Sequence, residues 1–127
     1  MKVVLVGDTG SPFPVNVIPI FVDSISPSAP NRPEPLMRVV WPPCQTNTQT
    51  PNLLVNGNPR IAVWSQAPTP PPGTFDFRSV MAHELGHAMG LAHHPTDQTS
   101  LMWDSFSPQE VRVPNNEDRD ALIGLYG

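Results

Sequence analysis

The sequence predicts an α+β domain in which short strands come first and helices follow. Fifteen of the 18 prolines lie in residues 12–72. Proline removes a backbone donor and fixes φ, so that part cannot form long helices. Between the prolines lie short runs rich in β-branched and aromatic residues, and helical periodicity begins only after Gly73. Strands followed by helices are typical of the α+β class.

Each run before Gly73 is bounded by proline, glycine or asparagine, as strands commonly are. Asn56-Gly57 is a strong turn signal between the last two runs. The segments 24–35 and 67–73 are loop-like connectors. The predicted strands are Lys2–Val6, Val15–Val22, Leu36–Trp41, Leu53–Val55 and Arg60–Ser65.

Two helices are predicted after Gly73. The first can be capped by Thr74 or Asp76 and end at Gly90, where a glycine suits a left-handed conformation. Its apolar residues recur at spacings of three and four: Phe77, Val80, Met81, Leu85 and Ala88. The second helix, Glu117–Leu125, can be capped by Asn115 or Asn116, and its predicted apolar face is Ala121, Leu122 and Leu125.

Length and composition exclude several classes of protein. The 127 residues fit one domain, 1–127, with a strand-rich part (1–73) and a helical part (74–127). Seven basic against 11 acidic residues argue against nucleic acid as a partner. No apolar run approaches the roughly 18 residues that a membrane span needs, and none near the start suits a signal peptide. The only cysteine, Cys44, cannot form an internal disulfide and is expected to be buried.

All four histidines fall in one stretch, HELGHAMGLAHH at residues 83–94. On a helix His83 and His87 lie one turn apart on the same face and can reach one metal ion. Glu84 lies about 100° further round, too far to be a third ligand but close enough to reach a water on that metal. Gly90 lets the chain reverse, so that His93 can supply a third imidazole.

Three histidines and one open position are typical of a catalytic zinc site. Zinc activates water and polarises a carbonyl, and Glu84 would take the proton of the attacking water and pass it to the leaving nitrogen. The alternative is a polar helix whose histidines are only solvated, but that would not explain why histidine occurs nowhere else.

The string HELGHAMGLAH resembles the zinc-binding consensus of the metzincin metallopeptidases. Ser100–Trp103 resembles the methionine-containing turn that lies beneath the zinc in that clan. Three segments resemble the matrixin branch: Asp76–Ala82 leads into the active-site helix, Trp103–Pro108 matches the wall of the primed-side specificity pocket, and Leu125–Gly127 matches the closing helix.

The resemblance implies a twisted, mostly parallel sheet with an active-site helix and a short C-terminal helix, here with a reduced N-terminal part. The family's long helix before the active-site helix has no counterpart in residues 1–73. The implied site residues are the zinc ligands His83, His87 and His93, the catalytic Glu84, the turn methionine Met102, and the pocket residues Phe106 and Ser105.

Some family features differ. His94 follows the third ligand, where matrixins often have serine, and it is expected on the rim of the site. No further histidine remains for a second zinc site. Calcium is possible but not assignable, because Asp8, Asp23 and Asp97 are scattered. Cys44 lacks the surroundings of the family's inhibitory cysteine.

The expected function is that of a zinc-dependent metalloendopeptidase whose peptide substrate lies extended along a strand edge, at Leu53–Val55 or the neighbouring strand. The resemblance implies a secreted monomer. Two alternatives remain: a non-catalytic, zinc-stabilised binding domain with a degenerate metzincin fold, and a member of another metzincin branch.

Overall fold

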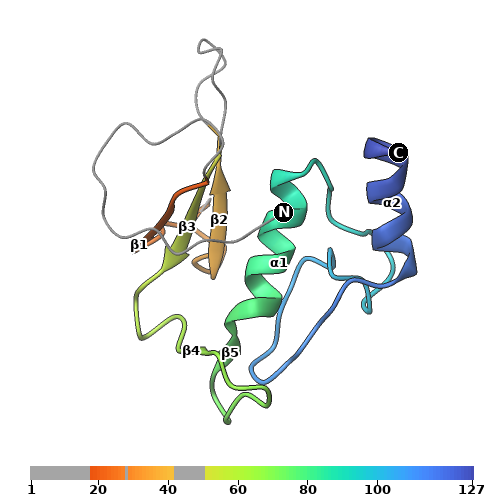
Figure 1. Ribbon diagram of the computed structural model, residues 1–127. Helices are drawn as coiled ribbons and strands as arrows, with labels where there is room; N and C mark the ends of the chain where they lie inside the picture. The colour runs from red at the N-terminus through yellow and green to blue at the C-terminus, as the bar shows by residue number, and fades with distance from the viewer. Residues whose placement is uncertain (1–17, 28, 42–50) are drawn as a thin grey trace.

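The structure is a computed structural model that describes residues 18–27, 29–41 and 51–127 (Figure 1). The predicted strand Lys2–Val6 and Cys44 lie outside these residues. The strands come first and the helices follow, which confirms the α+β class. The elements are β1 (Ile20–Asp23), β2 (Met37–Val40), β3 (Asn52–Asn56), β4 (Trp64–Ser65), β5 (Phe75–Asp76), α1 (Phe77–Ala88) and α2 (Asn116–Tyr126).

The main sheet has three strands in the order β1-β3-β2. β3 is parallel to β1, with Leu53 opposite Ile20, and antiparallel to β2, with Val55 opposite Met37. β4 and β5 form a separate parallel pair. The prediction that Leu53–Val55 is an open edge was wrong, since β3 has a partner on each side. The neighbouring strand β2 is the edge that packs against α1 (Figure 1).

The predicted strand Arg60–Ser65 shrinks to its last two residues. A turn precedes it, in which Ile61 N–H donates to Asn58 O at 2.9 Å. Asn56-Gly57 does not form a hairpin: Gly57 N–H donates to Asp23 O at 3.0 Å, and β4 pairs with β5. The turn signal therefore correctly marks the end of β3, but it does not join β3 to the next strand as a hairpin.

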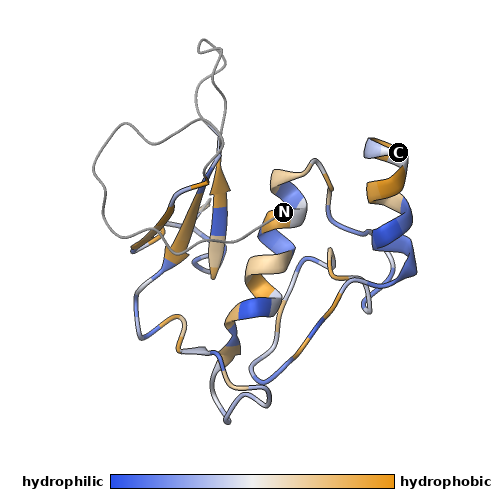
Figure 2. Cartoon of the chain, in the orientation of Figure 1, coloured by the Kyte–Doolittle hydropathy of each residue, from blue (hydrophilic) through white to orange (hydrophobic). Residues whose placement is uncertain are grey.

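The core lies between the main sheet and α1. Figure 2 shows hydrophobic residues concentrated on the three strands of this sheet. Met37, Leu53 and Val55 from the sheet and Val80 from α1 are buried together. The predicted apolar positions Phe77, Met81 and Leu85 pack against them. The histidines lie on a different side of α1 from these apolar residues.

Helix α1 begins and ends where its capping residues predict. The side chain of Asp76 accepts a hydrogen bond from Ser79 N–H at 3.3 Å and from Ser79 Oγ at 2.5 Å. After the helix, Gly90 adopts φ +101°, a left-handed conformation that a side chain would oppose. The chain therefore reverses at Gly90 toward His93.

Helix α2 begins with a capping box: the Asn115 side chain accepts from Asp118 N–H, and the Asp118 carboxylate accepts from Asn115 N–H. Its predicted apolar face was wrong, because only Leu122 is half-buried, whereas Ala121 and Leu125 are exposed. Polar contacts hold this helix instead. Within the described part of the chain, α1 and α2 are the only helices, and neither is long and apolar enough to cross a membrane.

Candidate metal centre

Three imidazole rings converge beside α1. His83 and His87 come from successive turns of the helix, and His93 comes from the segment that follows Gly90. His87 Nε2 lies 3.1 Å from His83 Nε2 and 3.1 Å from His93 Nε2. The sequence prediction that these three side chains meet at one point is confirmed.

Backbone carbonyls fix the orientation of two of the rings. His83 Nδ1 lies 2.7 Å from Leu101 O, and His87 Nδ1 lies 2.8 Å from Leu91 O. A carbonyl only accepts, so each Nδ1 carries the proton and donates it. Each Nε2 then presents a lone pair, as a metal-binding imidazole must.

Lone pairs facing one another at 3.1 Å repel unless a cation lies between them. His83 and His87 cannot hydrogen-bond each other through Nε2, because both Nδ1 atoms already hold the proton. Ligands at zinc–nitrogen distances of about 2.0–2.1 Å in a tetrahedron lie about 3.3 Å apart, close to the separations here. The donor set therefore fits Zn²⁺, and the cluster is consistent with a catalytic zinc site.

The electrostatics of the site favour the neutral form of His83 and His93. Burial is the main reason why the pKa of His83 is lowered to about 4. The hydrogen bond to Leu101 O raises this pKa, whereas His87, His93 and Arg112 lower it further. Burial also lowers the pKa of His93, and the nearby His87 adds to this shift. Metal ligands must be deprotonated, so these rings are ready to bind at neutral pH.

Glu84 lies in the same cleft as His87 and His93. The cleft has a volume of about 410 Å³, and its other wall is β2 and the following residue: Met37, Arg38, Val39 and Trp41. Burial raises the pKa of Glu84 to about 7, although the hydrogen bond from Val39 N–H and the charge of Arg38 oppose the shift. A divalent cation among the three imidazoles would favour the carboxylate form.

Met102 is buried beneath the helix that carries the histidines, with 2% of its surface exposed. A Cβ atom at Gly86 would lie 2.5 Å from Met102 Sδ and 3.2 Å from its Cε. Met102 O accepts a hydrogen bond from His94 N–H at 2.9 Å. The methionine therefore packs closely on α1 between the first two histidines and ties down the segment that carries His93.

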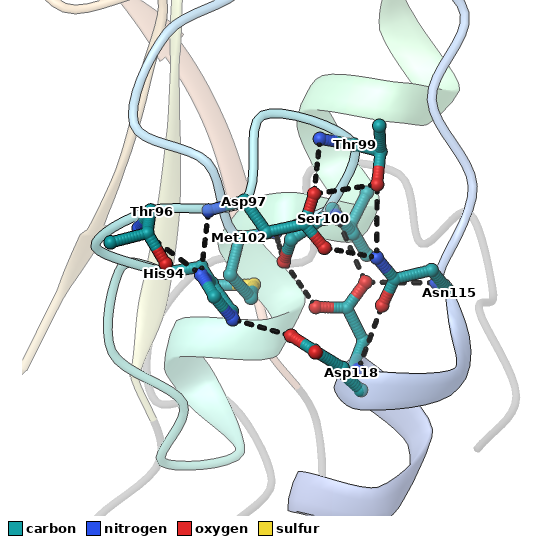
Figure 3. A network of polar contacts seen from close by, with 10 residues as sticks. His94, Thr96, Asp97, Thr99, Ser100, Met102, Asn115 and Asp118 are labelled. Atoms are coloured by element: carbon teal, nitrogen blue, oxygen red, sulfur yellow. Dashed lines mark hydrogen bonds and ion pairs between the residues drawn. The ribbon is translucent and has the colours of Figure 1, made fainter.

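Asp118 organises the turn around Met102 (Figure 3). Its carboxylate accepts hydrogen bonds from Ser100 Oγ, from Leu101 N–H at 2.8 Å and from Asn115 N–H at 2.9 Å. The carbonyl of the same Leu101 orients His83. The buried carboxylate of Asp118 thus positions Leu101, whose carbonyl in turn orients His83.

Phe106 and Ser105 lie on the loop after this turn. The Phe106 ring meets the His83 ring edge-on, with centroids 5.6 Å apart. Ser105 is exposed, and its carbonyl accepts a hydrogen bond from Arg112 Nη2 at 2.6 Å. Phe106 therefore lies beside the metal centre, whereas Ser105 contributes its backbone to the loop.

Comparison with known proteins now identifies the family. The model of the matrixin peptidases matches residues 39–127, more than half of the chain. The chain belongs to the matrixin family. It is 37% identical over 60 residues to metalloendoproteinase 1 of Glycine max, a match covering 46% of this chain and 19% of that protein. It is also 39% identical over 56 residues to matrix metalloproteinase-20 of Homo sapiens, covering 42% and 11% of the two chains.

A third relative, the probable matrix metalloproteinase 095L of Invertebrate iridescent virus 3, is 44% identical over 48 residues, covering 38% of this chain and 13% of that protein. The matches therefore span a fifth or less of the length of these relatives. The matrixin match includes all three histidines, Glu84 and Met102.

His94, the residue that departs from the matrixin pattern, is turned away from the other histidines. Its Nδ1 accepts hydrogen bonds from Thr96 N–H and Asp97 N–H, and its Nε2 lies 2.6 Å from Glu117 Oε2 (Figure 3). Although His94, Asp97 and Glu117 lie close together, both ring nitrogens of His94 already have partners. His94 links the loop to α2.

Sequence reasoning missed several residues of this matrixin site. The carbonyls of Leu91 and Leu101 carry no sequence signal, because any residue provides one. Asp118 could have been found from the Asn115-x-x-Asp118 capping pattern, but its bonds to Ser100 and Leu101 could not. The β2 wall of the cleft depends on strand order, which the local pattern does not specify.

Proposed function

We propose that this matrixin domain, residues 1–127 acting as one unit, is a zinc-dependent metalloendopeptidase. The observation that carries the proposal is the convergence of three imidazoles at one point, with a carboxylate in the same cleft. A purely structural zinc site would have four protein ligands. Here the described groups near the three rings include no fourth nitrogen or sulfur ligand within reach, and Glu84 lines the cleft instead.

His83, His87 and His93 are the proposed zinc ligands, and Met102 is the proposed packing residue beneath them. When bound, zinc supplies Lewis acidity that polarises the scissile carbonyl and makes water more acidic. Glu84 is the proposed general base and acid: its carboxylate accepts a proton from the attacking water and then delivers it to the leaving nitrogen. The hydrogen bond from Val39 N–H holds this carboxylate against β2.

The substrate is proposed to lie extended along the outer edge of β2, which has no strand partner on that side among the described residues. Leu36 O accepts from Asn56 N–H, so in the alternating antiparallel ladder the backbone groups of Met37 and Val39 point away from β3. They face the cleft that Glu84 and the histidines line. Val39 N–H already donates to Glu84, so a peptide would pair with the backbone groups of Met37 and with Val39 O. Such a peptide would pass beside Glu84, and Phe106 and Ser105 would border the subsite next to His83.

The compartment and the assembly state are further parts of the proposal. Relatives in animals and a virus are named as matrix metalloproteinases. We therefore propose that this domain acts as a monomer outside the cell, on protein or peptide substrates. Detection of the protein in culture medium and a monomeric mass by light scattering would support this.

The decisive experiment replaces Glu84 with glutamine. Glu84→Gln keeps the size of the side chain but removes the base, so we expect kcat/KM on a quenched peptide library to fall by about 10²–10⁴. Bound zinc, measured by metal analysis, should remain at one ion per chain. Asp120→Asn, at an exposed carboxylate on α2, is the control and should keep full activity.

Unchanged hydrolysis in Glu84→Gln would refute the mechanism. If the unmodified chain binds one zinc ion but cleaves no peptide in the library, the domain is a non-catalytic, zinc-stabilised binding module.

A further inference from the structure

We propose that Trp41 is a specificity-determining residue, whose indole selects an aromatic side chain of the substrate. The inference rests on the proposed function, and it concerns a substrate residue on the N-terminal side of the bond that is cut. Trp41 entered the sequence-based predictions only as the last residue of a strand.

Trp41 forms part of the cleft wall that faces the metal centre. It follows β2 directly, and it lines the same cleft of about 410 Å³ as Glu84, His87 and His93. Side chains alternate between the two faces of an extended chain, so Trp41 belongs to the same face as Val39, which also lines the cleft. A peptide bound beside the metal centre would therefore lie within reach of the indole.

The indole of Trp41 is accessible and is not needed for packing. Trp41 is 52% exposed. Trp64 shows the contrast: its Nε1 donates to Asn56 O at 2.9 Å, and its ring meets the Phe77 ring edge-on with centroids 5.4 Å apart. In the part of the chain that the structure describes, Trp41 has neither such an acceptor nor such a ring. Its ring face and its N–H donor are thus both available to a ligand in the cleft.

An indole face attracts two kinds of side chain. Aromatic rings stack on it in an offset or edge-on arrangement, and this adds to the gain from burying their apolar surface. Cationic side chains are attracted by the negative face of the ring. The remaining charges of the cleft decide which of the two fits better.

These charges disfavour a basic side chain. Arg38 lines the cleft, and its positive charge already acts on Glu84. A divalent cation among the histidines adds two further positive charges, and the carboxylates of Glu84 and Asp104 offset only part of the sum. Like charges repel across a distance of a few ångströms even in water. A neutral aromatic side chain therefore suits the indole better than a lysine or an arginine.

Strand geometry defines which substrate residue meets Trp41. Two residues of a strand span about 6.7 Å, so Trp41 lies that far along the chain from Val39, whose N–H holds Glu84. In a peptide paired with β2, side chains on one face also recur at every second residue. Antiparallel pairing, the more stable arrangement, places the N-terminal part of the peptide at the end of β2 where Trp41 lies. The selected residue thus comes two positions before the residue beside Glu84.

The test uses the zinc-loaded full chain and three acetylated tripeptide hydroxamates, X-alanine-glycine, in which X is phenylalanine, alanine or arginine. The glycine hydroxamate binds the metal, so X comes two residues before the group beside Glu84. Isothermal titration calorimetry gives the Kd values without turnover. The unmodified protein should bind the phenylalanine compound about 10-fold more tightly than the alanine compound, and more tightly than the arginine compound.

Three variants and one spectroscopic signal locate the effect at Trp41. Trp41→Ala should reduce the ratio to about 2-fold or less, whereas Trp41→Phe keeps a ring and should retain about 5-fold. Val63→Ala is the control, because Val63 is exposed to a similar degree, 48%, outside the cleft, and it should leave the ratio unchanged. The NMR signal of the Trp41 indole N–H, assigned by its loss in Trp41→Phe, should shift more with the phenylalanine compound than with the alanine compound.

Equal binding of the phenylalanine and alanine compounds by the unmodified protein, no binding of the phenylalanine compound, or tighter binding of the arginine compound would overturn the proposal whether or not the variants fold. A folded Trp41→Ala with the original ratio would also overturn it. Failure of the proposed function is a separate result: the protein would show the expected ratio and the indole shift but hydrolyse no peptide.

Discussion

The absence of a Cβ atom at Gly86 allows α1 to lie close to the turn around Met102. Glycine in the middle of a helix is normally unfavourable by roughly 0.5–1 kcal/mol relative to alanine. Here the missing side chain leaves room for Met102, whose Sδ would lie 2.5 Å from a Cβ at that position. Because Met102 is buried, its side chain has little space into which it can retreat. The glycine is thus required by packing, despite its low helix propensity.

We expect Gly86→Ala to destabilise the domain by about 1–2 kcal/mol, because overpacking outweighs the gain in helix propensity. Gly124→Ala on α2 is the matched control, since nothing lies within 4 Å of a Cβ there, and it should be neutral or stabilising by up to about 1 kcal/mol. Urea unfolding of both variants measures the difference. Equal effects of the two substitutions would show that Met102 does not restrict Gly86.

At the scale of elements, α2 is held mainly by polar contacts. Ile123, Leu125 and Tyr126 are exposed, and the buried residue of this helix is Asp118. Burial opposes its ionisation, but hydrogen bonds from Ser100, Asn115 and Leu101 outweigh this and hold the pKa of Asp118 below its usual value. At the other end of the helix, Tyr126 Oη donates to Met89 O at 2.6 Å. α2 therefore connects the turn around Met102 to the end of α1.

The Asp118 carboxylate makes the stability of the domain depend on pH. Its folded pKa lies below the ordinary value of 3.8, so its contribution is fully present above about pH 4 and is lost as the pH falls through the folded value. We expect Asp118→Asn to cost about 2 kcal/mol at pH 7 and clearly less at pH 3. Urea unfolding at both pH values, with a chelator present to remove zinc, measures the loss of unfolding free energy in the variant.

Asp120→Asn provides the control for this comparison, because Asp120 is exposed on the same helix. It should change stability little at either pH. A deficit in Asp118→Asn that is the same at pH 3 and pH 7 would contradict a role for the charged form.

On the scale of the whole molecule, the metal centre joins α1 to the segment after Gly90 and, through Leu101, to the turn held by α2. The three histidines come from α1 and from the segment after Gly90, and the carbonyl that orients His83 belongs to the turn held by α2. The buried hydrophobic cluster, in contrast, lies between the main sheet and α1. A metal ion bound by the histidines would therefore stabilise the part of the chain that lies outside this cluster.

Zinc should accordingly raise the stability of the folded chain. At free zinc about 100-fold above Kd, we expect a gain of about 2.7 kcal/mol, and chelation should remove it. His93→Ala should abolish most of this gain. His94→Gln should retain it, since both nitrogens of His94 already have partners on the loop and on α2. Calorimetric unfolding with and without zinc measures the stability gain of each variant. If His94→Gln gained no stability from zinc, His94 would belong among the ligands.

The sequence by itself determined the features that depend on local spacing. The period of apolar residues fixed the buried face of α1, Asp76 and Gly90 fixed its ends, and the spacing of His83, His87 and His93 fixed the metal centre. These features depend on helix geometry and on one reversal of the chain, which neighbouring residues control. For the same reason the Asn115 cap of α2 could be predicted from sequence.

Only the tertiary structure decided which distant segments meet. Strand order made β2, and not Leu53–Val55, the edge beside the histidines. The loop path brought Asp118 to Leu101 and Arg112 to Phe106, and it left the expected apolar face of α2 largely exposed. These contacts join residues far apart in the chain, and their energies depend on how the whole chain packs. No local pattern of residues encodes them.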